Sequence, residues 1–182
     1  MNTAIAPPRA SEVAYTRDGA SFRIRPIRPD DADRERAFIA ALSDESRHNR
    51  FMYAMREPPA ALIERLTHVD QKRTMALLAV IGEPPDERII GVARYAADDA
   101  GEDCEFAVTV ADGWQGRGVG TMLARAIFEH ARAQRFRRIY GLVLASNDRM
   151  VQLARYLGLE MRPQPGCPGV LEAYRRLDGG SA

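Results

Sequence analysis

Three glycines stand close together in the segment 115–120, Gln-Gly-Arg-Gly-Val-Gly, directly before a stretch with helical apolar spacing. Glycine lets the backbone pass close to a ligand, and the first amides of a helix have no intrahelical acceptor. Such a loop can bind an anion through N–H groups that point outward at a helix N-terminus. The sequence therefore predicts an anion-binding cradle at Gly116, Gly118 and Gly120.

Two common phosphate-binding motifs fit this loop poorly. A P-loop needs Lys followed by Ser or Thr after its last glycine, and that pair is absent after Gly120. The dinucleotide fingerprint needs a third glycine where Thr121 stands, and the loop 111–114 separates the glycines from the preceding strand pattern. A P-loop is excluded and a dinucleotide site is weakly supported. The structural alternative is that the glycines only turn the chain and cap the helix. The strand, Gln115 and the helix would then stand beside them by coincidence, so we favour a ligand site.

Glu105 is the one acid inside the apolar strand pattern 104–110. Because side chains alternate across a strand, it lies on the face opposite Phe106. Burial on that face would raise the pKa of the carboxyl group, which suits a general base. The structural alternative is an exposed acid near the start of the strand, beside Glu102 and Asp103.

Apolar spacing and turn residues predict the elements that position these groups. Strands are predicted over 21–27, 74–81, 89–95, 104–110, 138–144, 159–161 and 170–176. Helices are predicted from Pro29 to near Leu42, from Ser43 to Phe51, from Pro58 to His68, after the glycine loop, and over 147–157. The order indicates a mixed α/β chain with an antiparallel-rich sheet.

The chain has 182 residues, of which 46% are hydrophobic, enough for one compact core. We expect a single domain over 12–178, with mobile ends at 1–11 and 179–182. The formal net charge of +1 gives no overall field toward nucleic acid or an anionic membrane, so neither is expected as a partner.

Cysteine and histidine are too few and too scattered for a metal site. Cys104 and Cys167 have no CxxC spacing, and His48, His68 and His130 complete no ligand set. No apolar run approaches the ~18 residues that span a bilayer. We therefore expect no metal and a cytoplasmic protein.

The loop matches the signature Gln/Arg-x-x-Gly-x-Gly/Ala through Gln115, Gly118 and Gly120. In this the sequence resembles the GCN5-related N-acetyltransferase (GNAT) family, whose signature binds the pyrophosphate of acetyl-CoA. The resemblance covers about residues 20–177 and includes a later helix, Asn147 to Gly158, similar to the second CoA-contacting helix of the family. Within the family it is most similar to the acetyltransferase domain of Pat-type protein lysine acetyltransferases. The narrower resemblance rests on segments 25–28, 43–47, 75–77 and 105–108.

The resemblance implies an α/β GNAT fold, with a mixed, mostly antiparallel central sheet of about six or seven strands flanked by helices. The sheet is expected to splay at the acetyl-CoA site, so that the pantetheine arm pairs with the strand before the glycine loop. A backbone N–H near Val108 would polarise the thioester carbonyl. The implied cofactor contacts are Val108, Thr109, Val110, Gln115, Gly116, Arg117, Gly118, Val119, Gly120, Thr121 and Asn147.

The reaction implied is transfer of acetyl from acetyl-CoA to a primary amine by direct attack, with Glu105 as the catalytic base. A base is needed because a lysine-like amine, with a pKa of about 10.4, is mostly protonated near neutral pH. A protein lysine is the acceptor that the Pat-like segments suggest. A small-molecule amine, or a non-catalytic acyl-CoA-binding module, remains the alternative, and a homo-oligomer is left open.

The chain departs from the family at the tyrosine that often protonates the CoA thiolate. Counted from Asn147, that position is Ala154. Tyr156 lies about 200° further round the helix. It could replace the missing acid, or it could only pack in the core or lie at an exposed edge. In the latter cases a water, or no group, protonates the thiolate. Asn147 itself is suited both to capping a helix and to contacting CoA.

Overall fold

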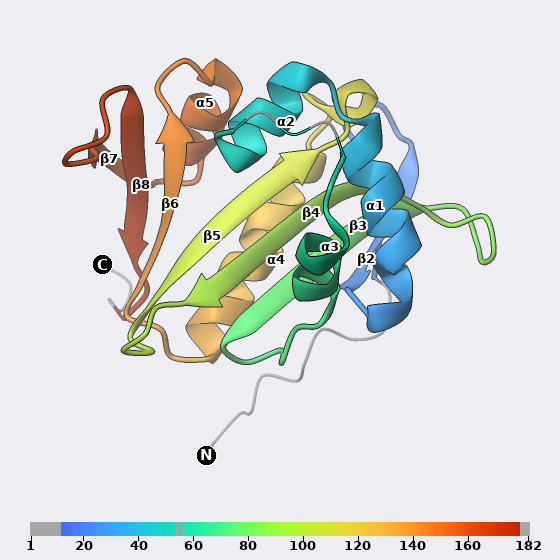
Figure 1. Cartoon of the computed structure of the whole chain (residues 1–182), viewed down its shortest axis with the longest axis horizontal. Coiled ribbons are helices and arrows are strands. Elements are labelled where there is room, and N and C mark those ends of the chain that lie inside the picture. Colours follow the sequence, from blue (N-terminus) through green and yellow to red (C-terminus); the bar gives the residue numbers. More distant parts are fainter. Residues whose placement is uncertain (1–11, 54, 56, 179–182) are drawn as a thin grey trace.

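The computed structural model describes residues 12–53, 55 and 57–178, so the predicted mobile ends lie outside the described residues. The chain forms one eight-stranded sheet in the order β1-β2-β3-β4-β5-β6-β8-β7, with helices on both faces (Figure 1). The strands are β1 (Glu12–Tyr15), β2 (Ser21–Pro26), β3 (Thr74–Ile81), β4 (Arg88–Ala97), β5 (Asp103–Val110), β6 (Arg138–Leu144), β7 (Glu160–Pro163) and β8 (Val170–Arg176). The helices are α1 (Ala32–Ala41), α2 (Asp44–Phe51), α3 (Ala60–Thr67), α4 (Val119–Ala133) and α5 (Asp148–Tyr156).

This architecture confirms the predicted α/β class and the mostly antiparallel sheet. All neighbouring strands are antiparallel except β5 and β6, which are parallel. β1 falls outside the predicted strands and brings the sheet to eight. It is a short edge strand with Val13 and Tyr15 exposed, so it lacks the buried alternation by which a strand is recognised. None of the described helices is both long and apolar enough to cross a bilayer.

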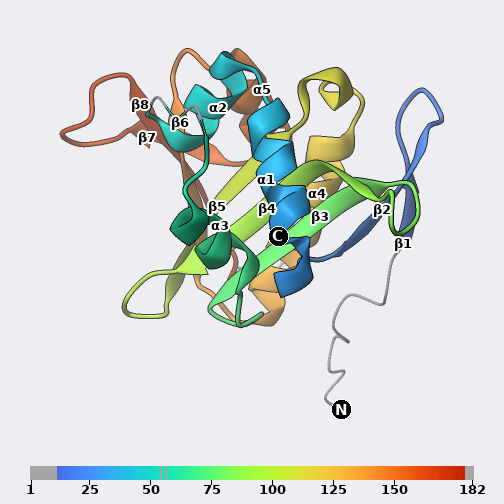
Figure 2. The ribbon, with the colours of Figure 1, turned by 45° about the vertical axis from the view of Figure 1, so that its right-hand side comes forward.

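β3 explains why the sheet carries two apolar layers. Its run of apolar residues is buried on both faces, so the pattern is continuous rather than alternating. Met75, Leu77 and Ala79 pack in the layer beneath α4 and α5. The alternate residues Ala76, Leu78 and Val80 pack on the other face, against α1 and α3. Figure 2 shows α1 and α3 on one side of the sheet and α4 on the other.

An ion cluster fixes the start of α1 against β2. The buried guanidinium of Arg25 donates two hydrogen bonds of 2.7 Å to Asp31 and also pairs with Glu87. These partners raise the pKa of Arg25, because the hydrogen bonds to Asp31 favour the charged form. The cluster therefore ties β2, the turn before α1 and the start of β4 together.

β5 and β6 pair only at their beginnings. The register joins Asp103 to Arg138, Cys104 to Ile139 and Glu105 to Tyr140, and ends there. Beyond this point the two strands diverge, which Figure 1 shows as a gap opening toward α2 and α5. The expected splay of the sheet is therefore present, on the expected strand.

Gly141 stands at the point where the strands part. A Cβ on this residue would lie 2.8 Å from the carbonyl oxygen of Phe106 and 2.9 Å from its ring, closer than real contacts. β6 can thus approach β5 at this position only with glycine.

We expect Gly141→Ala to lower the free energy of unfolding by about 1 to 3 kcal/mol, because the new methyl group must displace the Phe106 backbone. Urea unfolding followed by circular dichroism measures this change. Gly113→Ala is the matched control, since nothing lies within 4 Å of a Cβ there. Equal stability losses in the two variants would contradict the close approach of β6 to Phe106.

Candidate active site

The glycine loop leads from a short 3-10 turn, Asp112–Trp114, into α4. Gly118 is the N-cap of α4 with φ 97°, and Gly116 has φ 74°, so both adopt conformations that side chains rarely tolerate. Gly120 serves another purpose, because a Cβ there would lie 3.3 Å from Val110. It allows α4 to pack closely on β5. The first amides of α4 begin beside the open end of the β5–β6 gap.

Gln115 anchors the loop to its surroundings. Its side-chain amide donates to the carbonyl oxygen of Val110 at 3.0 Å and to the hydroxyl of Ser46 at 3.1 Å, and its oxygen accepts from Arg149. The loop is thereby linked to the end of β5, to α2 and to α5. The family resemblance identified Gln115 and included Ser46 in segment 43–47, but it did not predict their contact, and Arg149 carried no recognisable signal in the sequence.

Asp112 joins α2 to the glycine loop. Its carboxylate accepts hydrogen bonds from the backbone N–H of Ser43 at 2.9 Å and from the hydroxyls of Ser43 and Ser46 at 2.8 and 2.7 Å. Burial opposes its ionisation, but these hydrogen bonds outweigh burial and hold the pKa of Asp112 below its ordinary value. Ser43 is also the N-cap of α2, accepting from Ser46 N. The start of α2 is therefore fastened to residues 112–115.

Arg117 is engaged by neighbours in the protein. Its guanidinium pairs with Asp18 and lies 4.4 Å from the centroid of the Trp114 ring. Its carbonyl oxygen accepts from Arg17 N at 3.0 Å, so the turn between β1 and β2 is bound to the loop. The structure thus places the Arg117 side chain in an ion pair.

The other predicted cofactor residues lie on β5 and in the first turn of α4. Val108 and Val110 pack against the core beneath α4, and Val119 is buried in it, whereas Thr121 is half-buried. The side chain of Thr109 faces the opposite side, and its hydroxyl oxygen is buried without a hydrogen-bond partner among the described residues. The backbone of β5 beyond Glu105 runs along the gap, where no register pair with β6 continues.

Glu105 lies at the last paired position, directly beside Tyr140 on β6. Its side chain is exposed, as the structural alternative had it, yet the protein around it partly desolvates the carboxyl group. This desolvation raises the pKa of Glu105, and the charge of Arg50 acts in the opposite direction. Burial, together with the negative charge of Glu105, also raises the pKa of Tyr140. Glu105 therefore lies where the β5–β6 pairing ends, with its pKa raised above the ordinary value.

The position of the missing family tyrosine is in the core, and Tyr156 is on the surface. Ala154 is fully buried in the core. Tyr156 is 62% exposed, and its hydroxyl lies 3.5 Å from Arg125 of α4. Asn147 caps α5 by accepting from Met150 N at 3.1 Å. The structure thus shows the capping role of Asn147, and it places Tyr156 on the outer surface.

Two hollows accompany these elements. An open one of about 460 Å³ is lined by Ala145 and by the turn 163–171, and includes neither Glu105 nor the glycine loop. A second, of about 10 Å³, lies between Thr109 and helices α1 and α2. Within the described part of the chain, no group of three or more His, Cys, Asp and Glu side chains could hold a metal ion.

Removing the Asp112 carboxylate should release α2 while leaving the sheet intact. In Asp112→Ala we expect the amides of α2 to exchange with deuterium about tenfold faster, because local opening needs less free energy. Hydrogen exchange read by mass spectrometry measures this. Asp99→Ala, an exposed acid in the turn between β4 and β5, is the control and should leave α2 unchanged. Unaltered exchange in Asp112→Ala would show that α2 is held by other contacts.

The fold and the loop can be compared with known proteins. The solved GNAT domain of S. lividans PAT matches with a TM-score of 0.85 and 30% identity, covering 94% of this chain and 99% of that domain. A cAMP-binding acyltransferase from Mycobacterium smegmatis matches with a TM-score of 0.65 and 25% identity, covering 93% of this chain and 48% of that one.

Sequence relatives agree with this comparison. Acetyltransferase PA5475 from Pseudomonas aeruginosa is 38% identical over 148 residues, covering 81% of this chain and 80% of that protein. Acetyltransferase Pat from Mycolicibacterium smegmatis is 32% identical over 143 residues, which is 78% of this chain but only 42% of Pat. The family model for the acetyltransferase (GNAT) domain matches residues 21–160. The chain therefore belongs to the GNAT family of acetyltransferases.

Proposed function

We propose that this acetyltransferase moves the acetyl group of acetyl-CoA to the side-chain amine of a protein lysine, with Glu105 as the general base. The observation that carries the proposal is the position of Glu105 at the last paired residue before β5 and β6 separate. Glu105 therefore lies beside the start of the gap, where the proposal places the acyl-CoA thioester.

The donor side of the proposal rests on the free edge of β5 and on the glycine loop. Past Glu105, β5 stays paired with β4, while its other edge has lost β6. Because backbone groups in such a gap need partners, a pantetheine arm can pair with Val108, Thr109 and Val110. The amides from Gly116 to Thr121 then meet the pyrophosphate at the N-terminus of α4. These residues fit acetyl-CoA as the donor.

In this arrangement Glu105 removes a proton from the incoming ammonium, and the neutral amine nitrogen attacks the thioester carbonyl. A backbone N–H near Val108 stabilises the negative oxygen of the tetrahedral intermediate. The carbon–sulfur bond then breaks to release the CoA thiolate, and the nitrogen gives up its remaining extra proton, to the thiolate or to water, to form the amide. The raised pKa of Glu105 brings its basicity nearer to neutral pH, which favours proton transfer.

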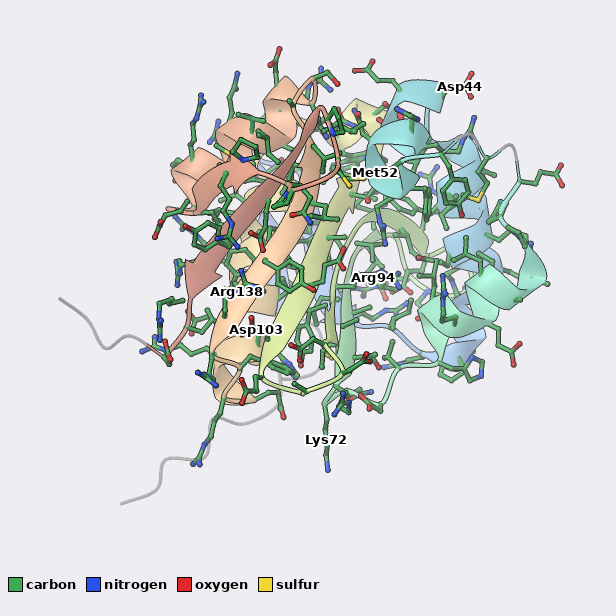
Figure 3. The ribbon with its side chains drawn as sticks, turned by 60° about the vertical axis from the view of Figure 1, so that its left-hand side comes forward. Asp44, Met52, Lys72, Arg94, Asp103 and Arg138 are labelled. Atoms are coloured by element: carbon green, nitrogen blue, oxygen red, sulfur yellow. The ribbon has the colours of Figure 1, made fainter. Side chains whose placement is uncertain are left out.

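A protein acceptor is supported by the open sheet beside Glu105. Figure 1 shows β6 and β8 uncovered on the face where α1 and α3 cover β3 and β4. This face carries Tyr140, with Arg138 4.8 Å from its ring centroid, and Arg138 also pairs with Asp103 and Glu172. Figure 3 shows Arg138 of β6 beside Asp103 of β5. A flat polar surface of this kind admits a protein segment more readily than an enclosed pocket would.

We expect Glu105→Gln to lower kcat by about 10²- to 10⁴-fold, because the amine loses its base, with acetyl-CoA affinity nearly unchanged. CoA thiol release with lysine-containing proteins measures turnover, and calorimetry measures binding. Glu102→Gln, in the same segment but exposed and paired with Arg137, should keep full activity.

The same assays separate the alternatives. Turnover with small amines alone would replace the protein acceptor by a small-molecule one. Acetyl-CoA binding without turnover on any amine would indicate a binding module. Full activity of Glu105→Gln would remove Glu105 from the mechanism.

Replacing a glycine of positive φ should weaken acetyl-CoA binding only where that glycine lies in the 115–120 loop. Gly116 and Gly166 both have φ 74° and nothing within 4 Å of a built Cβ. Alanine at either position should cost about 1 kcal/mol of stability. Only Gly116→Ala should weaken acetyl-CoA binding, by roughly tenfold or about 1.4 kcal/mol, measured by calorimetry. Equal affinities in both variants would place the pyrophosphate away from Gly116.

A further inference from the structure

The small cavity of about 10 Å³ lies where α1, α2, β4 and β5 meet, and it has room for about one water. Most of the side chains around it are apolar. The polar ones are Glu35 from α1, Arg50 from α2, Arg94 from β4 and Thr109 from β5. A cavity with wholly apolar walls stays dry, whereas polar groups in the wall favour a polar occupant. The lining therefore indicates a site for one small polar molecule.

Two buried oxygen atoms in this lining have no partner among the described residues. Glu35 is 2% exposed, and one of its carboxylate oxygens accepts from Arg94 at 2.7 Å, but the other, Oε2, is unpaired. The hydroxyl oxygen of Thr109 is buried and unpaired as well. Leaving a buried polar atom without a hydrogen bond is costly, and ordered water commonly supplies the partner. Both oxygens therefore need a partner inside the cavity.

The two guanidinium groups of the lining differ in what they already bind. Arg94 donates to Glu35 and, at 3.1 Å, to the carbonyl oxygen of Leu66. Figure 3 shows Arg94 between the sheet and the helices that cover it. Arg50 lies over the ring of Phe51, with its Cζ 4.9 Å from the ring centroid, and a cation is attracted to a ring face without a conventional hydrogen bond. In the part of the chain that the structure describes, no hydrogen bond from the Arg50 guanidinium is found. Arg50 can therefore supply a donor to the cavity.

We propose that this cavity is a binding site for one ordered water, which bridges Glu35 of α1 and Thr109 of β5. One O–H of the water donates to Glu35 Oε2, and its oxygen accepts from the Thr109 hydroxyl and from an N–H of Arg50. Three partners is the usual number for a buried water. The inference is independent of the proposed function, because it concerns neither the acceptor nor the base.

Such a water joins the helices on this face to the strand beside the gap. Within the described ranges, no direct hydrogen bond links the Thr109 hydroxyl to α1 or α2. At its first turn, α2 is held by the hydrogen bonds of Ser43 and Ser46 to Asp112. At its last turn, the water links α2 to β5 through Arg50. The two ends of the helix are then held by separate polar contacts.

Thr109→Val tests the bridge by the sign of its effect on stability. Valine keeps the shape of threonine but lacks the hydroxyl. If that hydroxyl were unpaired, its removal would leave stability unchanged or increase it. With the water in place, a hydrogen bond is lost. We therefore expect the equilibrium constant for unfolding to rise about fivefold, measured by urea unfolding followed by circular dichroism.

Thr67→Val is the matched control. Thr67 is 1% exposed, and its hydroxyl donates to the carbonyl oxygen of Ile63 at 3.0 Å. This variant loses a hydrogen bond between two protein groups, so its unfolding constant should rise by a comparable factor. A loss of stability in Thr67→Val, together with unchanged or greater stability in Thr109→Val, would overturn the inference.

A high-resolution crystal structure of the wild-type chain gives a measurement that needs no variant. We expect an electron-density peak within about 2.5–3.2 Å of both Glu35 Oε2 and the Thr109 hydroxyl oxygen, and its loss or displacement in crystals of Thr109→Val. If Thr109→Val does not fold, as judged by circular dichroism, the wild-type crystal decides alone. A cavity without such a peak, or a peak bonded to only one of the two oxygens, shows that no water bridges Glu35 and Thr109.

Discussion

The separation of β5 from β6 after Glu105 and Tyr140 is the constraint on which the rest of the site depends. A parallel pair that continued to the ends of both strands would close the sheet and satisfy its backbone groups internally. Here the pairing stops, and the facing edges beyond it must find partners in a ligand or in water. β5 tolerates this because it stays paired with β4 from Gly91 to Ala97. Gly141 marks the last place where the two strands can touch.

Of the two proton transfers in the proposed reaction, removal of a proton from the amine needs help from the protein more than protonation of the CoA thiolate does. A lysine amine with a pKa of about 10.4 is neutral in only about one molecule in a thousand near pH 7.4, so the attacking group needs a base. A thiol has a pKa of about 8.5, so a thiolate leaves readily without prior protonation. The protein carries a carboxylate at the gap, whereas Ala154 is in the core and Tyr156 points outward. Losing the tyrosine that protonates the thiolate should therefore slow the reaction less than losing the base would.

Local pattern was sufficient to predict most of the fold. The apolar run of β3, the alternation of β5 and the apolar stripe of α4 each reflect burial of their own side chains, which the sequence records directly. The positive φ at Gly116 and Gly118 was likewise implied by residue type. The gap between β5 and β6 was not, since both strands look regular in sequence. It followed only from the family resemblance.

What escaped sequence reasoning are the polar contacts between distant segments. Asp112 meets Ser43 and Ser46 across more than sixty residues of chain, and an Asp in a turn has no pattern that names such partners. Arg50 belongs to a polar helix without a buried residue, so no periodicity indicates which side chain turns inward. Only the arrangement of α1, α2, β4 and β5 in space brings Arg50 together with Glu35, Arg94 and Thr109 around one small cavity.

The first residues of α2 bind Asp112 and Gln115, and its last turn lines a small cavity together with Thr109 of β5. Under the proposed function, α2 is therefore a spacer of fixed length between the loop assigned to the donor and the part of β5 assigned to the acceptor. An insertion or deletion in α2 would pull Ser43 from Asp112 or rotate Arg50 away from β5, since each added residue turns a helix by about 100°. During divergence, residues 43–51 and 112–118 can change length only together.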